Sequence, residues 1–598
     1  MPQLWEVVGG ADKGGIIVRE GKTTASATCE ERLSTGAILE EIELEKERLH
    51  FKRLTGTGPP EGWISIKLPG RELASRIDGD AADYAGGGGG AADAGADAGD
   101  DEEEPQRVYP PFKAVSVPQI EYMEIRDLAV KNEPGDYYGI KFPHSLAQLQ
   151  DKEFGAAWLT KAFHKSGVLS KSNAVTKILE GKEFVGGGAG LKAIIKVEYK
   201  KDKPYLHKDL FIKLPHPPKG SDRYYVSCMW GHDRPETIFN IWLEKSVPFK
   251  VPKFYFADIC ASTTNFILIT ERINMRDHKV SIPKLTNAKA HYEASDFKVG
   301  DFEPAYDKYL DWWQIRDQGR EHYFLSCKAL GKMAGYHKCG KLHPQVNDMF
   351  PMPGPAPPVP QGIPGNVGNM EVGKVDQLVR FVTGAAAKVM PDEVKDAGFL
   401  EKWKGDVLNY MNYPNETGLY LSGGGAENPL DYVGLTHNNL QIDNAFFYHD
   451  DGGLQVGLLD WGVLACGPLA GSVQGCISGA TVEVLLEKRD DFLRAFIDSY
   501  AENGGPTLDF ERFKMMSNLN MMGWSSSVTS NVSQVLKHTK QKEWDSISEW
   551  TDEKLINRFQ TRAHTTQFKY SLQIWKAWDL AEVFKQWTQQ NGLPENKW

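Results

Sequence analysis

The sequence LTHNNLQIDNAFFYHDDGGLQVGLLDWG occupies residues 435–462 and carries the most informative pattern in the chain. Two short apolar runs flank an Asp-Asp-Gly-Gly turn, which is typical of a β-hairpin. Because a hairpin brings its two ends together, Asn444 before the first run and Asp460 after the second are expected to face one site. Hard oxygen ligands from both residues, together with phosphate oxygens, are what Mg²⁺ prefers. The stretch therefore predicts a magnesium and phosphate site.

The order of residues around this hairpin resembles a known family. His437, Asn444 and Asp460 match H-x-D-x-x-x-x-N followed by a hairpin and D-W, the catalytic and metal segment of kinase-like phosphotransferases. With D-W in place of D-F-G, the stretch is similar to the aminoglycoside phosphotransferase and choline-kinase-like branch. The resemblance implies that Asn444 and Asp460 hold Mg²⁺ and that His437 is the structural histidine of the catalytic loop.

One position departs from the family pattern. Asn439 stands where the family has an aspartate, two residues after the histidine, that receives the proton of the substrate hydroxyl. An amide cannot accept a proton at neutral pH, although it can accept a hydrogen bond and orient a hydroxyl. Loss of a general base typically costs ~10²–10⁴-fold in rate, so Asn439 weakens the enzyme interpretation without abolishing it. Asp443 is nearby, but its place directly before Asn444 predicts that its side chain points elsewhere.

A glycine-rich run, FVGGGAGL at residues 184–191, lies between two strand-like segments. Glycines let backbone amides approach phosphate groups. Taken alone, such a run is more often a plain hairpin turn. The resemblance makes it the phosphate loop and implies that Gly187, Gly188 and Gly190 contact the nucleotide.

The next part of the pattern is a lysine with a partner glutamate. Lys213 lies in the apolar strand-like run LFIKLP, and alone it reads as an edge lysine whose stem covers apolar surface. The resemblance makes it the lysine that grips the α- and β-phosphates of ATP. Glu236 in PETIFNIW is the candidate glutamate that orients Lys213, and Glu244 is its rival. Glu236 aligns better because the family places this glutamate well ahead of a V-P-x-x-Y strand, here VPKFY at 251–255; without the resemblance it is a first-turn acid favoured by the helix dipole.

Two further segments continue the same order. The run NFILITERI resembles the strand that enters the hinge between the two lobes, so the backbone of Glu271, Arg272 and Ile273 is expected to meet the adenine. The amphipathic stretch 320–337 resembles the long helix of the carboxy-terminal lobe. The resemblance covers roughly residues 144–500 and rests on the ordered set of motifs, since no single motif is decisive.

Composition divides the chain into parts. Residues 4–75 contain short β-rich runs with turn signals that predict a small barrel, and Gly62-Trp63 makes this part resemble a bacterial-type SH3 domain. Residues 76–107 are acidic and rich in Gly, Ala and Asp, which predicts a flexible linker. Residues 108–275 are expected to form the amino-terminal lobe with a helical lead-in, and 276–598 a helical carboxy-terminal lobe. The predicted fold class is α+β, a two-lobed protein-kinase-like fold preceded by an SH3-like β-barrel.

Composition and charge also exclude several classes. The chain has 598 residues and a net charge of -11, and ten of its acids lie within 78–104, so nothing suggests nucleic-acid binding. The seven cysteines are scattered and form no C-x-x-C pair, which indicates free thiols in a reducing compartment. The first residues resemble no signal peptide, and the uncharged run 461–482 is too polar for a membrane span. The motif HKCGKLH, beginning at His337, has loose metal-ligand spacing without a fourth ligand, so zinc is not expected.

These observations lead to one expected function and two alternatives. The leading hypothesis is a cytoplasmic phosphotransferase that uses ATP and Mg²⁺ to phosphorylate a hydroxyl of a small molecule, with activity impaired by Asn439. The first alternative is a pseudokinase that binds nucleotide or partners and acts as a scaffold. The second is a phosphotransferase fold with a purely structural role in a larger assembly. The amino-terminal barrel is expected to bind a peptide or protein partner or a glycan, or to pack on its neighbour.

Overall fold

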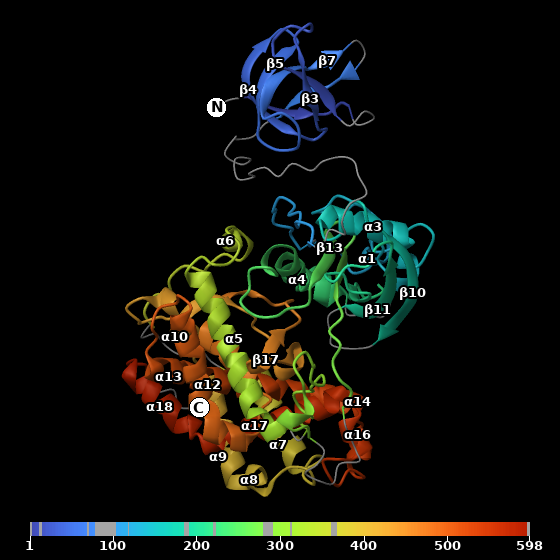
Figure 1. Cartoon of the computed structure of the whole chain (residues 1–598). Coiled ribbons are helices and arrows are strands. Elements are labelled where there is room, and N and C mark those ends of the chain that lie inside the picture. Colours follow the sequence, from blue (N-terminus) through green and yellow to red (C-terminus); the bar gives the residue numbers. More distant parts are fainter. Residues whose placement is uncertain are drawn as a thin grey trace. The chain divides into compact units, whose positions relative to one another are not determined.

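The computed structural model describes residues 3–10, 15–68, 71–77, 103–117, 119–184, 190–218, 223–278, 291–310, 314–359 and 367–594. The chain forms two compact units, Met1–Asp101 and Glu102–Trp598. Figure 1 labels the elements of each unit. In the described part, no helix combines the length and the apolar composition that crossing a membrane would require.

The first unit is an antiparallel sheet with strand order β3-β2-β6-β5-β4-β1-β9. Alternating burial along β5 places Leu49 and Phe51 in a core that also contains Val18 and Ile64. The predicted β structure of this part is confirmed, whereas no pairing between β3 and β9 closes the sheet into a barrel among the described residues. The strands are β1 (Leu4–Val7), β2 (Ile16–Arg19), β3 (Thr28–Leu33), β4 (Ile38–Glu45), β5 (Arg48–Arg53), β6 (Glu61–Ser65), β7 (Lys67–Leu68), β8 (Arg71–Glu72) and β9 (Ala74–Ile77).

The range predicted as a linker, 76–107, overlaps described structure at both of its ends. Arg76 pairs with Trp5 in the ladder between β9 and β1. Residues 103–107 belong to the second unit, where the side chain of Arg107 is buried. The rest of the range, 78–102, lies outside the described residues. Composition averages over a window of residues, so it cannot show that one arginine at the edge of an acidic run has a buried partner.

The amino-terminal part of the second unit is built on a five-stranded antiparallel sheet with order β10-β11-β12-β14-β13. The strands β13 and β14 are rich in apolar residues and are buried on both faces along almost their whole length. The elements of this part are α1 (Ile125–Leu128), α2 (Leu146–Leu149), α3 (Gly155–Ser166), β10 (Val175–Phe184), β11 (Leu191–Tyr199), β12 (Asp209–Leu214), the π-helix η3 (Tyr224–Met229), α4 (Asp233–Ile238), the π-helix η4 (Phe239–Leu243), β13 (Phe254–Cys260) and β14 (Asn265–Glu271).

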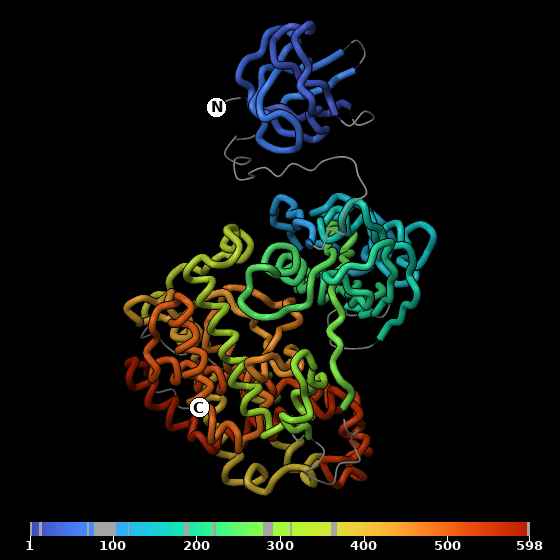
Figure 2. The backbone as a smooth tube through the Cα atoms, in the orientation of Figure 1, coloured from blue at the N-terminus to red at the C-terminus, as the bar shows by residue number. Residues whose placement is uncertain are grey.

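The rest of the second unit is mainly helical and is organised around two long helices. Glycine at positions 331 and 335 of α5 lets the backbone of α12 approach, because a Cβ there would collide with the carbonyl oxygens of Phe496 and Tyr500. The predicted helix at 320–337 is confirmed as α5. Figure 2 shows the backbone of the sheet and of the helical region as adjoining parts of the second unit. The helices are α5 (Arg320–Lys338), α6 (Val346–Met349), α7 (Asn369–Thr383), α8 (Asp392–Lys395), α9 (Ala397–Tyr410), α10 (Pro414–Leu421), α11 (Leu469–Ile477), α12 (Val482–Glu502), α13 (Phe510–Val528), α14 (Val532–His538), α15 (Gln541–Trp544), α16 (Glu553–Ile556), α17 (Phe559–Ala577) and α18 (Leu580–Gln590).

The predicted hairpin is confirmed as β16 (Ala445–Asp450) and β17 (Gly453–Leu458), which pair in antiparallel register. A second short pair, β15 (Val433–Thr436) with β18 (Ala465–Pro468), brackets it in the sequence. Together the two pairs hold the segments before and after the hairpin side by side. The fold of the second unit is therefore mixed helix and sheet, as predicted.

Candidate active site

Three side chains from separate parts of the second unit meet at one ammonium group. Lys213 on β12 places its Nζ 2.5 Å from Oε2 of Glu236 on α4 and 3.1 Å from Oδ1 of Asp460, which follows β17. The side chains of Lys213 and Glu236 are 4% and 9% exposed, whereas that of Asp460 is 35% exposed. The cluster is therefore buried at its base and open to solvent on the side of Asp460.

The opposite charges in this cluster stabilise the ionised forms of Lys213 and Asp460. Burial alone would lower the pKa of Lys213, but the carboxylates of Asp460 and Glu236 outweigh burial and raise it. The Lys213 ammonium lowers the pKa of Asp460 to about 2 and outweighs the partial desolvation of this carboxylate. Burial raises the pKa of Glu236, and Lys213 partly counteracts this. A permanent ammonium and an ionised aspartate thus stand side by side at neutral pH.

The two candidate glutamates have different partners. Glu236 contacts Lys213, whereas Glu244, at the end of the same helical segment, makes an ion pair of 2.9 Å with Arg107. The glutamate in contact with Lys213 is therefore Glu236, which is also the one that the order of motifs favours. The role of Glu236 in holding a nucleotide remains a prediction.

The ends of the β16–β17 hairpin meet as expected. The amide of Leu459 donates to the carbonyl of Asn444 at 2.8 Å, and Nδ2 of Asn444 donates to the carbonyl of Asn439 at the same distance. This bond uses Nδ2 of the Asn444 side chain and does not involve its Oδ1. The oxygen Oδ1 is the atom of the amide that a hard cation prefers as a ligand. Asp460 adopts a left-handed backbone conformation with φ of 61°. Such a conformation is strained for a non-glycine residue and is found disproportionately at functional sites.

His437 lies beneath the loop rather than at its surface. It is fully buried, and its Nε2 donates to the carbonyl of Leu459 at 2.6 Å. Burial lowers the pKa of His437, which favours the neutral ring. Because Leu459 precedes Asp460, this bond ties the loop of residues 437–444 to the aspartate. The role of structural histidine stays a prediction.

Trp461 connects the same aspartate to the helix that carries Glu236. Its ring stacks on Phe239, with centroids 3.7 Å apart, and lies parallel to Phe249 at 6.1 Å. Trp461 is 2% exposed. The packing of this indole therefore fixes the end of β17 against the helix α4–η4.

The glycine-rich run is described only in part. Gly187 and Gly188 lie outside the described residues. Gly190 has φ of 78°, and a Cβ there would lie 2.7 Å from the carbonyl oxygen of Leu214. This position requires glycine, because the chain turns tightly against the end of β12.

The expected hinge lies at the end of β14. The amide of Glu271 donates to the carbonyl of Lys253 at 2.7 Å, and Oε2 of Glu271 accepts from the amide of Lys253 at 3.1 Å. Ile273 follows β14, and its carbonyl accepts from the amide of Met275 at 3.0 Å. Neither residue belongs to the cluster at Lys213, and contact of their backbone with adenine stays a prediction.

Comparisons with known proteins complete this description. No family model and no curated protein matches the sequence. Among solved structures, the chain is similar to choline kinase from Cryptosporidium parvum Iowa II, with 12% identity and a TM-score of 0.33 over 74% of this chain and 97% of that chain. It is also similar to the GDP complex of aminoglycoside 2′-phosphotransferase-IIIa, with 14% identity and a TM-score of 0.28 over 65% of this chain and 94% of that chain. A third is the macrolide 2′-phosphotransferase from Brachybacterium faecium, with 12% identity and a TM-score of 0.28 over 63% and 93% of the two chains.

The structure adds two residues that the sequence did not indicate. Lys192 on β11 stands directly opposite Lys213 in the ladder with β12, and residues directly opposite in an antiparallel pair project to the same face. Burial and the neighbouring Lys213 lower the pKa of Lys192 to about 8. Asn438, with φ of 57°, donates from Nδ2 to the carbonyls of Val463 and Ala465. Lys192 could have been found from the register between the two strands, whereas Asn438 carried no signal beyond its place in the loop.

The donor set fits a magnesium ion that shares its shell with phosphate. Among the described residues, no group of three or more His, Cys, Asp or Glu side chains could by itself hold a metal ion. A site with one carboxylate and one amide oxygen leaves most positions of an octahedral shell to phosphate oxygens and water, which is usual for Mg²⁺ at nucleotide sites. Asp460 and Asn444 provide that pair.

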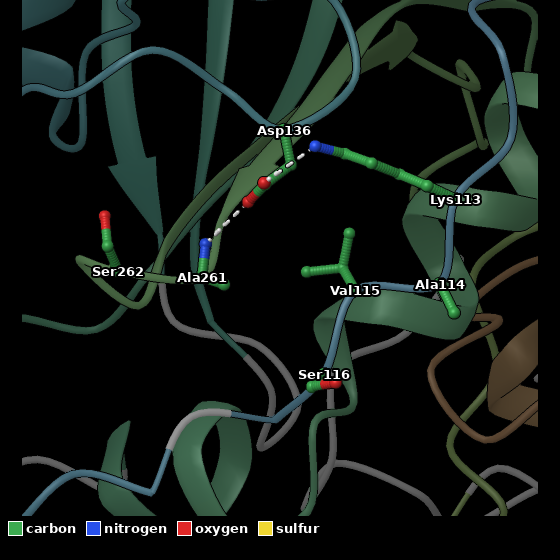
Figure 3. A pocket seen from close by; sticks show the side chains of 7 residues that line it. All are labelled: Lys113, Ala114, Val115, Ser116, Asp136, Ala261 and Ser262. Carbon is green, nitrogen blue, oxygen red and sulfur yellow. Dashed lines mark hydrogen bonds and ion pairs between the residues drawn. The ribbon is translucent and has the colours of Figure 1, made fainter.

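A surface pocket lies elsewhere on the second unit, and Figure 3 shows its lining side chains. Its volume is about 340 Å³. None of the predicted site residues lines it. The lining residues are Lys113, Ala114, Val115, Ser116, Asp136, Ala261 and Ser262.

Proposed function

We propose that the second unit is a two-lobed, kinase-like phosphotransferase that uses ATP and Mg²⁺ to phosphorylate a hydroxyl of a small molecule. The observation that carries this proposal is the contact of the Lys213 ammonium with both Glu236 and Asp460. A buried ammonium needs charged partners because of its desolvation, and this one is placed between a helix and the end of a hairpin where an anionic ligand can reach it. Phosphoryl transfer relies mainly on positioning and charge neutralisation, and this cluster supplies both.

Each residue of the cluster has a distinct role in this proposal. Lys213 binds phosphate oxygens, and Glu236 holds its ammonium in place. Asp460 and Asn444 hold the magnesium ion. Magnesium-bound ATP supplies the phosphoryl group and partly neutralises its charge. Backbone groups at Glu271 and Ile273 meet the adenine, and Gly187, Gly188 and Gly190 line the phosphates.

The acceptor hydroxyl is oriented by Asn439. Its carbonyl is tied to Nδ2 of Asn444, so the loop places the Asn439 amide next to a proposed metal ligand. An amide can accept the hydrogen bond of a hydroxyl but cannot take its proton, which therefore leaves to solvent or to the phosphate. We expect a slow enzyme for this reason.

A pseudokinase scaffold is the second candidate, and Asn439 is the observation that favours it. The first unit would then serve a peptide or protein partner, as its resemblance to SH3 domains implies. All seven cysteines are free thiols, which fits a reducing compartment such as the cytoplasm. The phosphotransferase binds nucleotide and turns it over, whereas the scaffold binds nucleotide or partners without turnover.

Thermal unfolding in the presence of ATP, with and without Mg²⁺, tests the proposal. Saturation at ~100 times the dissociation constant should stabilise the folded unit by ~2.7 kcal/mol. Asp460→Ala should remove most of the dependence on Mg²⁺. Asp451→Ala, in the exposed turn of the same hairpin, is the matched control and should behave like the wild type. Absence of any shift at millimolar ATP and Mg²⁺ would rule out the phosphotransferase and any scaffold that binds nucleotide.

A further inference from the structure

The segment 103–117, here called the strap, lies along the helix α4–η4 that carries Glu236. It runs in the opposite direction to that helix, since its start contacts the helix end and its end contacts the helix start. Residues 113–116 of the strap also form one wall of the pocket in Figure 3, opposite Asp136 and the turn at Ala261 and Ser262.

Arg107 anchors the start of the strap. Its Nη1 donates to the carbonyls of Asn240 at 3.1 Å and Ile241 at 3.4 Å, and its Nη2 makes the 2.9 Å ion pair with Glu244. The guanidinium lies 4.3 Å from the centre of the Phe254 ring. The side chain of Arg107 is 2% exposed. Nη1 is the hydrogen-bonding end of this guanidinium, whereas Nη2 meets Glu244 as a charge pair without an aligned hydrogen bond. The position of Arg107 is nonetheless specific, because desolvation of a buried cation is offset only where carbonyls and a carboxylate face it.

The other end of the strap is anchored at the start of the helix. Nη2 of Arg234 donates to the carbonyl of Ser116 at 3.2 Å. Between the two anchors, Phe112 packs edge-on against Trp242, with ring centroids 5.4 Å apart. The strap therefore contacts the helix at both ends and in the middle.

Further contacts tie the strap to its surroundings. Glu104 pairs with Lys245 at 3.4 Å and with Lys253 at 3.1 Å. The ring of Tyr109 lies 5.7 Å from that of His343, in the loop after α5. Since α5 belongs to the helical region, the strap bridges that region and the helix α4–η4.

A short chain of hydrogen bonds leads from Arg107 to Glu236. Arg107 bonds to the carbonyl of Asn240, and Nδ2 of the same Asn240 donates to the carbonyl of Glu236 at 2.8 Å. Asn240 lies in η4, where the helix is wound as a π-helix. A π-helical turn is less favourable than an α-helical one and often occurs at functional sites, so outside contacts are needed to hold this winding.

We propose that the strap keeps Glu236 against Lys213 and that Arg107 is a positioning residue for the phosphate site. The inference rests on the proposed function, because it concerns the grip of Lys213 on nucleotide. Trp461 supports the helix from the hairpin side through Phe239. The strap supports the same helix through its own contacts at both helix ends and in the middle. Displacement of the strap would therefore loosen the helix and weaken binding of Mg²⁺-ATP.

The test measures dissociation constants of Mg²⁺-ATP for the full chain by calorimetry. Arg107→Met should weaken binding about 5- to 150-fold, the usual range of coupling between sites. Lys113→Met is the matched control, because it removes a cation from the same strap, where Lys113 is 57% exposed and pairs with Asp136 at 3.2 Å. The control should bind like the wild type.

A double-mutant cycle separates positioning from a general loss of stability. If Arg107 acts through Glu236, Arg107→Met should have no further effect on affinity in a Glu236→Gln background. Equal effects in both backgrounds would overturn the inference. Glu244→Gln is the milder variant should Arg107→Met fold poorly, since Gln can still accept the 3.2 Å bond from the amide of Phe254. It should weaken binding about two- to five-fold, and unchanged affinity would count against the strap.

Hydrogen exchange provides a readout that does not depend on nucleotide. Arg107→Met should accelerate exchange of the amides of 233–244, while those of α12 (Val482–Glu502) exchange as in the wild type. Unchanged exchange at 233–244 would overturn the inference. Failure of the wild type to bind Mg²⁺-ATP would refute the proposed function instead, and the exchange data would then decide alone whether the strap holds the helix.

Discussion

The indole of Trp461 stacks on the ring of Phe239 with centroids 3.7 Å apart and planes 11° from parallel. Trp461 directly follows Asp460, and Phe239 is three residues after Glu236. Both carboxylates that touch Lys213 are therefore connected by one aromatic contact. Motion of the helix and motion of the hairpin end are coupled through this stack.

Replacement of Trp461 tests that coupling. Trp461→Ala should destabilise the second unit by about 3–5 kcal/mol, because it opens a cavity at a side chain that is 2% exposed. Trp461→Phe keeps a ring against Phe239 and should cost less. Urea denaturation followed by circular dichroism measures both. Trp230→Ala is the control, since Trp230 is 66% exposed and should change stability by less than about 0.5 kcal/mol.

Asn439→Asp should raise turnover by about 10²–10⁴-fold. The change restores a carboxylate two residues after His437, where it can receive the proton of the acceptor hydroxyl. Affinity for ATP should hardly change, because Asn439 is proposed to contact the acceptor and not the nucleotide. ATP hydrolysis, followed by transfer to a panel of amino alcohols and sugars, measures the gain. Asn439→Gln keeps an amide at this position and is the control that should show no gain in turnover. If Asn439→Asp binds ATP without any turnover, the scaffold function is favoured.

Lys192 should act as a second cation for the phosphates, since it stands opposite Lys213. Its pKa of about 8 means that it is charged below that pH and neutral above. Binding of ATP by the wild type should therefore weaken as pH rises through about 8. Lys192→Met should bind ATP roughly tenfold more weakly at pH 7, as expected for loss of one charged contact, and show less of this pH dependence.

The matched variant for Lys192 is Lys192→Arg, which stays charged at every pH tested. It should keep ATP affinity at pH 9. Binding of adenosine, which has no phosphate, should be the same in all three proteins. Equal weakening of adenosine and ATP in Lys192→Met would instead indicate a change in the shape of the site.

Glu303 should make the second unit sensitive to acid. Although burial opposes ionisation, hydrogen bonds from His322, His449 and Tyr306 lower its pKa to about 2. A carboxylate with a lowered folded pKa stabilises above its unfolded pKa, near 4.5, and this stability is lost as pH falls towards 2. The contribution at neutral pH is about 3 kcal/mol.

Urea denaturation of the wild type and of Glu303→Gln across pH 7 to 3 checks this. The wild type should lose stability below about pH 5, and the variant should be less stable at pH 7 with a flatter profile. Glu401→Gln, an exposed residue of α9, is the control. Parallel profiles for Glu303→Gln and the wild type would show that Glu303 does not titrate as described.

Several features followed from the sequence because they depend on neighbours along the chain. The hairpin that joins Asn444 to Asp460 needs only two apolar runs and a turn of the right length, and it formed as predicted. The helix at α5 and the strands of the first unit likewise reflect local periodicity and turn residues. The order of motifs predicted that Lys213, Glu236 and Asp460 belong to one site, and these three side chains are in contact.

The partners of the charged residues were decided only by the tertiary structure. Glu236 and Glu244 lie on one helical segment, yet Lys213 contacts the first and Arg107 the second. Arg107 was assigned to an acidic linker, and its buried partners are more than a hundred residues away. Lys192 lies opposite Lys213 because of the register between β11 and β12. A local pattern carries information about residues a few positions apart, whereas an ion pair in a buried site depends on which distant segments pack together and exclude water.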